Sequence, residues 1–185
     1  MNKKAAIAVV GTLDSKGEEH LFLKKCIEQR GFPALTVNVG TKHPPLFPPD
    51  MDLFPEILRE IGNDPGDRDR VISLALQKGR DLVRKLYGEG AICGMISAGG
   101  GTGTHLGTGI MRVLPLGVPK VMVSTVASRN MAAIVGTKDI VMMHSVVDIL
   151  GVNSISGVIL ENAAGAVCGM VDRKWRPPKE KKRIA

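Results

Sequence analysis

A glycine-rich stretch is the part of the sequence best suited to bind a ligand; it consists of Gly99, Gly100, Gly101, Thr102, Gly103 and Thr104. Glycine permits φ > 0 and lets backbone N–H groups approach a ligand closely. A helix expected from about His105 would direct the positive end of its dipole at the same point, and the two threonines would add hydroxyl donors. Because a tight helix entry needs one glycine and not four, the stretch predicts a phosphate-binding loop.

A second loop that favours anions follows the first apolar run and contains Gly11, Thr12, Asp14 and Lys16. Asp14 could bind a metal such as Mg²⁺ held on phosphates, and Lys16 could pair with phosphate charge. The alternative is that Asp14 or Ser15 only caps the next helix, because Ser15 and Glu18 have the spacing of a capping box. The residues leave both interpretations open.

Known phosphate motifs match the glycine-rich stretch only in part. A P-loop requires Gly-Lys before Ser or Thr, which this stretch lacks. A dinucleotide fingerprint requires glycine where Leu106 stands, and an acid where Ser124 ends the following strand. These departures disfavour NAD and leave ATP as the favoured nucleotide, with GTP as the alternative.

Short apolar runs alternating with helical patterns must position these loops. Strands are expected at residues 5–10, 34–39, 91–97, 118–123 and 140–143, and helices at about 15–30, from 67 onward, at 105–114 and at 155–171. Residues 44–55 are rich in proline and predict a loop. This alternation predicts an α/β fold with an open, mainly parallel sheet and helices on both faces, a Rossmann-like three-layer sandwich.

Ligands of such sheets bind outside the carboxyl ends of the strands. Four loops should therefore meet in one cleft: residues 11–16, 97–104, 124–130 and 144–148. The third loop would form the wall opposite the glycines. The predicted ligand contacts are thus completed by Ser97, Ser124, Thr125, Ala127, Ser128 and Arg129.

Length and charge predict one nucleotide-binding domain over residues 1–172 and a basic tail over residues 173–185. The whole chain has 185 residues and a formal charge of +7, and the tail carries all but one of these net charges. Aromatic and basic residues do not alternate as a base-stacking surface requires, so nucleic acid is disfavoured as a partner. Three widely spaced cysteines and the lack of a long apolar run favour a cytoplasmic protein without a membrane anchor.

A series of motifs resembles one known family over about residues 5–171. The motifs lie at residues 11–16, 99–104, 107–108, 111–112, 114–120, 124–128, 135–140, 142–148 and 162–166. In this order they are similar to the amino-terminal, ATP-binding lobe of the family of the tobamovirus-resistance protein, which includes many bacterial proteins of unassigned function. The resemblance implies a Rossmann-like lobe that binds ATP. Arg129 stands where the family usually has glycine and could supply a phosphate contact.

The favoured function is a nucleotide-binding module that forms one lobe of a two-lobe protein. The rival is an ATP-dependent phosphotransferase or hydrolase, with Asp14 or Asp148 positioning a nucleophile and Lys16 or Arg112 stabilising transferred charge. A nucleic-acid-binding protein acting through its tail is a third possibility. Family members carry a second lobe of similar size, so this chain is expected to form a homo-oligomer or to bind a separately encoded second lobe.

Overall fold

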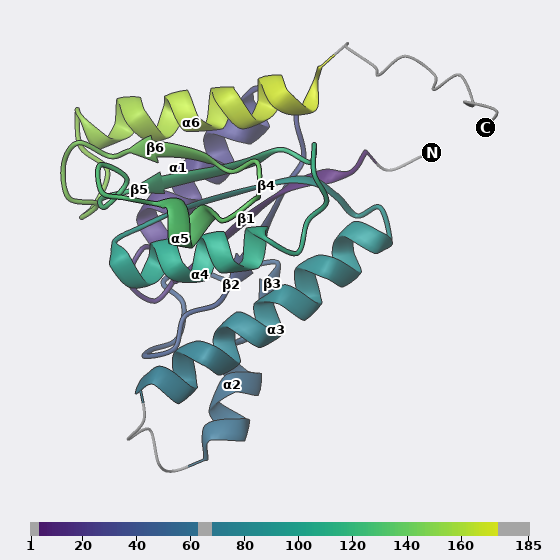
Figure 1. Cartoon of the computed structure of the whole chain (residues 1–185), viewed down its shortest axis with the longest axis vertical. Helices are drawn as coiled ribbons and strands as arrows, with labels where there is room; N and C mark the ends of the chain where they lie inside the picture. Colours follow the sequence, from purple (N-terminus) through teal and green to yellow (C-terminus); the bar gives the residue numbers. More distant parts are fainter. Residues whose placement is uncertain (1–3, 63–67, 174–185) are drawn as a thin grey trace, which may run out of the picture.

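A computed structural model describes residues 4–62 and 68–173, and within them one parallel sheet forms the centre of the molecule (Figure 1). Its strands are β1 (Ala6–Gly11), β2 (Ala34–Asn38), β3 (Met51–Asp52), β4 (Ile92–Gly99), β5 (Lys120–Ser124) and β6 (Val141–His144). Their order is β3-β2-β1-β4-β5-β6, and every neighbouring pair is parallel. The predicted Rossmann-like α/β class is confirmed.

Helices cover both faces of this sheet: α1 (Gly17–Gln29), α2 (Phe54–Ile61), α3 (Arg68–Gly88), α4 (Gly101–Met111), α5 (Ala132–Val135) and α6 (Ser156–Val171). Figure 1 shows α1 and α6 on one face, α3 and α4 on the other, and α2 beyond α3, farthest from α6. None of the helices in the described chain has both the length and the apolar composition needed to cross a bilayer.

Two hydrophobic cores separate the three layers. Leu23 of α1 and Val167 of α6 pack in the core that covers Ile7 and Val9 of β1. Alternate residues of the same strand, such as Ala8 and Val10, belong to the core under α3 and α4. Every residue of β1 is buried. The continuous apolar run that predicted a strand buried on both faces is thus explained by side chains that alternate between the two cores.

Several predicted boundaries were wrong. The proline-rich stretch predicted as a loop contains β3, and α2 begins at its end, where Pro55 occupies a first-turn position that needs no N–H. Helix α4 begins at Gly101 and not near His105. Helix α1 has Lys16 as its N-cap without a side-chain hydrogen bond, so Ser15 does not form a capping box. The predicted start of the long helix, Asp67, and the tail beyond residue 173 lie outside the described residues.

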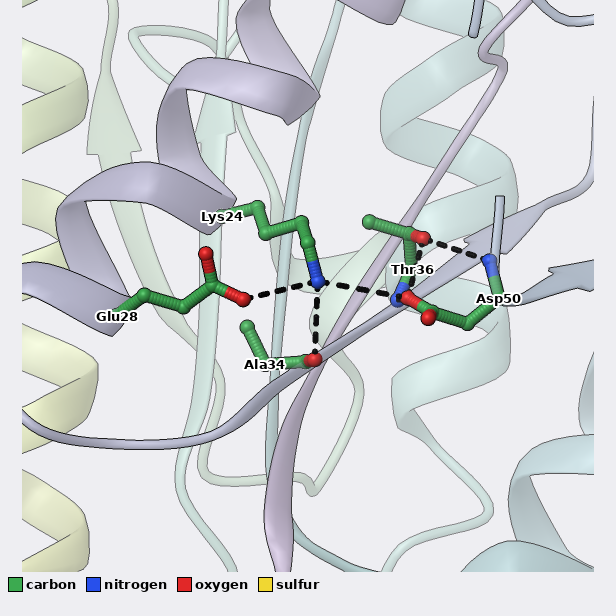
Figure 2. Close-up of polar contacts among 5 residues, drawn as sticks. All are labelled: Lys24, Glu28, Ala34, Thr36 and Asp50. Atoms are coloured by element: carbon green, nitrogen blue, oxygen red, sulfur yellow. Dashed lines mark hydrogen bonds and ion pairs between the residues drawn. The ribbon is translucent and has the colours of Figure 1, made fainter. Parts of the chain in front are cut away.

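The segment before β3 is anchored by a cluster of polar contacts (Figure 2). The Asp50 carboxylate accepts hydrogen bonds from Thr36 N–H at 2.8 Å and Thr36 Oγ1 at 2.7 Å. Lys24 of α1 lies between Asp50, at 3.6 Å, and Glu28, at 3.0 Å, and its ammonium donates to the Ala34 carbonyl. Burial tends to raise the pKa of Asp50, but the Thr36 hydrogen bonds and the Lys24 charge lower it overall.

An ion pair between a buried lysine and a partly exposed aspartate fixes the other side of the sheet. Lys120 opens β5 and is fully buried, and its Nζ donates to the carbonyls of Pro115 at 2.9 Å and Val118 at 2.6 Å. The same Nζ lies 2.8 Å from Asp139 Oδ1, while Asp139 Oδ2 accepts a hydrogen bond from Gly117 N–H at 2.7 Å. Burial tends to raise the pKa of Asp139, but the bonds from Lys120 and Gly117 lower it overall. The pair therefore joins the turn before β5 to the segment before β6.

Candidate functional site

The sheet changes its direction of winding between β1 and β4. From β1 the chain continues through α1 to β2 on one side, and from β4 it continues through α4 to β5 on the other. The two loops that leave these strands therefore diverge and open a crevice at the carboxyl edge of the sheet, the usual ligand position in open α/β folds. They are residues 11–16 and 99–104, the two predicted anion loops.

A cavity of about 860 Å³ opens at this point, which is within the range of small-molecule sites. Five parts of the chain form its walls: the two anion loops, the segment after β2, the C-terminal end of α2 and the N-terminal end of α3. Its lining residues are Thr12, Asp14, Ser15, Lys16, Thr41, Lys42, His43, Leu58, Ile61, Gly62, Arg68, Val71, Ile72, Gly99, Gly100, Gly101, Thr102, Gly103 and Leu106.

The glycine loop is open because its residues lack side chains, and not because its backbone is left-handed. The expectation of φ > 0 in this loop was wrong, since none of its glycines is among those with positive φ. A Cβ on Gly99 would lie 2.9 Å from Gly103 Cα, so glycine there permits a tight turn. A Cβ on Gly101 would meet no atom within 4 Å, because Gly101 faces the cavity.

The start of α4 presents backbone donors to the cavity. The first helical hydrogen bond of this turn runs from Thr104 N–H to the Gly100 carbonyl at 2.7 Å. The N–H groups of Gly101, Thr102 and Gly103 precede this bond, and the first turn of a helix directs such groups outward. Together with the helix dipole they form a site suited to an anion.

Charged side chains around the cavity are mostly cationic. Lys16, Lys42 and Arg68 line it together with one carboxylate, that of Asp14. Arg68, in the first turn of α3, reaches the glycine loop, where its Nη2 donates to Thr102 Oγ1 at 3.2 Å. Lys16 Nζ donates to the Ile149 carbonyl of the loop between β6 and α6. This balance of charge favours an anionic ligand.

Asp14 is held in the cavity wall by backbone groups. Its Oδ2 accepts hydrogen bonds from Lys42 N–H at 3.0 Å and His43 N–H at 3.4 Å. Its Oδ1 is buried and has no hydrogen-bond partner within the described chain. The alternative that Asp14 only caps α1 was wrong, because no side chain caps that helix. A carboxylate is a ligand of the type Mg²⁺ prefers, but this buried Oδ1 would have to become exposed to the cavity before it could bind a metal.

The described residues contain no cluster of three or more His, Cys, Asp or Glu side chains that could hold a metal by themselves. Asp14 could thus supply one protein ligand, and phosphate oxygens and water would have to supply the others.

Two buried polar residues that the sequence did not single out shape the site. Asn38, at the end of β2, accepts hydrogen bonds at its Oδ1 from Leu13 N–H at 3.0 Å and Gly40 N–H at 2.9 Å. Its Nδ2 donates to Asp52 Oδ1 at 2.8 Å. Asn38 therefore fixes the Asp14 loop, the segment after β2 and the entry to α2 relative to one another.

His20 of α1 fills the space between the two anion loops. Its Nδ1 lies 2.6 Å from the Lys16 carbonyl and its Nε2 lies 3.4 Å from Ala98 N–H. In the neutral ring, Nδ1–H can donate to the Lys16 carbonyl while Nε2 accepts from Ala98 N–H. Complete burial lowers the pKa of His20, which also favours the neutral form. A Cβ on Gly11 would lie 1.9 Å from His20 Nε2, so Gly11 is needed for packing.

Four of the predicted contact residues are buried and outside the cavity lining: Gly11, described above, and Ser97, Thr104 and Ser124. Thr104 Oγ1 and Ser124 Oγ form a hydrogen bond of 2.7 Å that joins the glycine loop to β5. Ser97 is buried beside Gly107, where an added Cβ would lie 2.7 Å from Ser97 Oγ. The side chains of Ser97, Thr104 and Ser124 position the loop.

The loop after β5 lies beside the glycine loop but contributes none of the cavity's described lining residues, which are those given above. Thr125 N–H donates to the Gly99 carbonyl at 3.2 Å, and Ala127 N–H to the Ser124 carbonyl at 3.4 Å. Arg129 N–H closes a turn on Val126 at 3.0 Å, and Ser128 lies between these residues. The wall opposite the glycines is formed instead by α2 and α3.

Curated bacterial and plant proteins are similar to this chain over nearly its whole length. A UPF0261 protein of Clostridium tetani is 41% identical over 184 residues, which cover 94% of this chain and 44% of that protein. A UPF0261 protein of Mesorhizobium japonicum is 42% identical, with 96% and 45% covered. The ToMV susceptible protein tm-1(GCR26) of Solanum lycopersicum is 32% identical, with 92% and 25% covered.

The chain therefore spans less than half the length of these relatives. Residues 5–176 match the family described as "Uncharacterised protein family (UPF0261) N-terminal domain". The chain belongs to the UPF0261 family and corresponds to its N-terminal domain.

Proposed function

We propose that this domain is a nucleotide-binding module and that its ligand is ATP, with Mg²⁺ carried on the phosphates. The observation that carries the proposal is the open start of α4, at Gly101, facing a cavity of about 860 Å³ whose lining residues include Lys16, Lys42 and Arg68. Backbone N–H groups and cationic side chains at one helix N-terminus are the usual means of binding phosphates. The Asp14 carboxylate is the type of ligand that Mg²⁺ prefers, and Asp14 lines the same cavity.

A panel of ligands measured by thermal unfolding tests this proposal. ATP with Mg²⁺, at 100 times its dissociation constant, should stabilise the protein by about 2.7 kcal/mol. For a domain of this size we expect the melting temperature to rise by about 5–10 °C. Adenosine, lacking phosphates, should give a much smaller shift at the same concentration. Melting temperatures that stay unchanged across ATP, GTP and their Mg²⁺ forms would contradict the proposal.

The phosphotransferase or hydrolase alternative has less support from the geometry. Arg112 follows the C-terminal end of α4, the end opposite Gly101. The Asp148 side chain accepts a hydrogen bond from the adjacent Ile149 N–H at 2.9 Å, and neither residue lines the described cavity. We therefore propose that the domain binds a nucleotide and that Arg112 and Asp148 have no catalytic role. We also propose that the protein is cytoplasmic.

We also propose that an exposed apolar surface at the β6 edge packs against a second lobe. Val141 lies on the edge strand, Val146 and Leu150 lie in the following loop, and Ile155 and Val158 lie at the start of α6. These side chains are 40–77% exposed. Edge strands and apolar patches of this kind are typical of surfaces covered by a partner. The relatives, with more than half their length outside the match, supply a candidate for that partner.

Sedimentation of the purified chain, alone and mixed with the remaining part of a longer relative, tests this surface. We expect a complex in the mixture, and weakening of it by Leu150→Ser, because Leu150 is 77% exposed at the proposed contact. Leu116→Ser is the matched control, since Leu116 is 76% exposed in the turn before β5. Dimers of the chain alone would indicate self-association instead, and monomers in both samples would contradict any such contact.

A further inference from the structure

The cavity has two chemically different halves. One half is polar and consists of the glycine loop with Asp14, Lys16 and Lys42. The other half is aliphatic and is formed by Leu58 and Ile61 of α2, Val71 and Ile72 of α3, and Leu106 of α4. A ligand that fills both halves must therefore have an anionic end and a flat or apolar end.

We infer that the aliphatic half binds the base of the nucleotide and that Arg68, between the halves, contacts its phosphates. This inference rests on the proposed nucleotide-binding function. It assigns the base to the side of the glycine loop that α2 and α3 occupy, and not to the side of residues 124–130. A purine ring buries large apolar faces, which aliphatic side chains can cover without loss of hydrogen bonds.

Helix α3 is held close to α4, which fixes Arg68 relative to the glycine loop. Two glycines permit the approach: a Cβ on Gly79 would lie 2.5 Å from Ile110 Cδ1, and a Cβ on Gly109 would lie 2.7 Å from Leu76 Cδ1. Arg80 Nε also donates to the Gly109 carbonyl at 2.9 Å. The aliphatic wall on α3 is therefore preformed.

Helix α2 is fixed on the other side of the cavity by polar contacts. Lys78 of α3 forms ion pairs with Glu60 and, at 3.5 Å, with Glu56. Phe54 N–H donates to Asp52 Oδ1 at 3.0 Å, so the start of α2 is tied to β3. Leu58 thus faces the cavity from a fixed helix while remaining 45% exposed. A bound base would remove this leucine from water.

Arg68 is suited to a phosphate contact by its chemistry and position. A guanidinium carries five N–H donors in a planar fork that matches two phosphate oxygens. The hydrogen bond from Arg68 Nη2 to Thr102 Oγ1 engages only part of this capacity. Thr102 follows Gly101 in the first turn of α4, so the guanidinium lies beside the backbone donors proposed to hold phosphate.

Binding of ATP and of inorganic tripolyphosphate, measured by calorimetry at one ionic strength, separates the two halves. Leu58→Ser should weaken ATP binding about tenfold and leave tripolyphosphate binding unchanged, because only ATP carries a base. Leu58→Met should retain wild-type affinity for both ligands. Leu116→Ser, on a more exposed leucine outside the cavity, is the control for general effects of the substitution.

Arg68→Ala should weaken the binding of both ligands about tenfold or more, whereas Arg84→Ala, on the exposed part of α3, should change neither. Wild-type ATP affinity in folded Leu58→Ser, or wild-type affinity for both ligands in Arg68→Ala, would overturn the inference while leaving the proposed function intact. Wild-type protein that binds neither ATP nor tripolyphosphate would overturn the proposed function itself.

Discussion

Replacing Gly101 with valine should abolish nucleotide binding and leave the fold unchanged. Gly101 is the first residue of α4, and an added Cβ there meets no protein atom within 4 Å. The valine side chain would therefore occupy the cavity directly in front of the helix N-terminus, where phosphate is proposed to bind. We expect affinity for ATP and for tripolyphosphate to fall at least 100-fold, equivalent to about 2.7 kcal/mol or more.

The stability of Gly101→Val should match or slightly exceed that of the wild type, because valine has a better helix propensity than glycine by a few tenths of a kcal/mol. Gly169→Val is the matched control. Gly169 lies in α6, on the opposite face of the sheet, and is likewise free of neighbours within 4 Å. Wild-type ATP affinity in folded Gly101→Val protein would mean that the phosphates bind elsewhere.

Five of the six strands, and the positions of the loops after β1 and β4, could be predicted because their signals are local. The apolar run of β1 ends at Gly11 and that of β4 ends at Gly99, so each loop follows directly from its strand. Parallel pairing then brings their carboxyl ends to one edge of the sheet. Gly31, predicted as the end of the first helix, has φ 79°, the left-handed conformation that glycine accepts after a helix.

The wall formed by α2 and α3 could not be assigned to the site from the sequence, because its position depends on long-range packing. Phe54, Ile57 and Ile61 are buried at helical spacing and could have indicated a helix after Pro55, had the prolines not suggested a loop. Nothing local to Arg68 shows that it reaches Thr102, since the two residues are 34 positions apart. The close contact between α3 and α4 at Gly79 and Gly109 also could not be predicted from the sequence.

The pairing of buried polar residues was the other feature that the sequence did not reveal. Ser124 and Thr104 were predicted to contact ligand because both have hydroxyls at the ends of strand or loop segments. In the structure each satisfies the other, 2.7 Å apart and fully buried. Asn38 was missed for the converse reason, because an asparagine at the end of a strand looks like an ordinary turn residue. Which polar groups pair with one another is decided by the tertiary fold.

The ion pair of the buried Lys120 with the partly exposed Asp139 gives the largest expected effect on stability. Asp139→Ala should lower the free energy of unfolding by about 3 kcal/mol, because it leaves a fully buried ammonium with only carbonyl partners. The lower end of the usual 3–5 kcal/mol range applies, since the Asp139 side chain is 35% exposed. Urea unfolding at neutral pH measures this difference.

Two further variants separate loss of the pair from loss of a surface charge. Asp81→Ala removes an exposed carboxylate paired with Arg84 and should change stability by less than about 0.5 kcal/mol. Lys120→Met combined with Asp139→Ala should recover much of the loss, because no charge is then left buried.

The pKa of Asp139 is lowered in the folded state. Its contribution to the free energy of unfolding is therefore complete above about pH 4 and declines as the pH falls through the native pKa. The loss caused by Asp139→Ala should therefore be as large at pH 5 as at pH 7, and equal stabilities of wild type and Asp139→Ala at both pH values would show that the ion pair does not stabilise the fold.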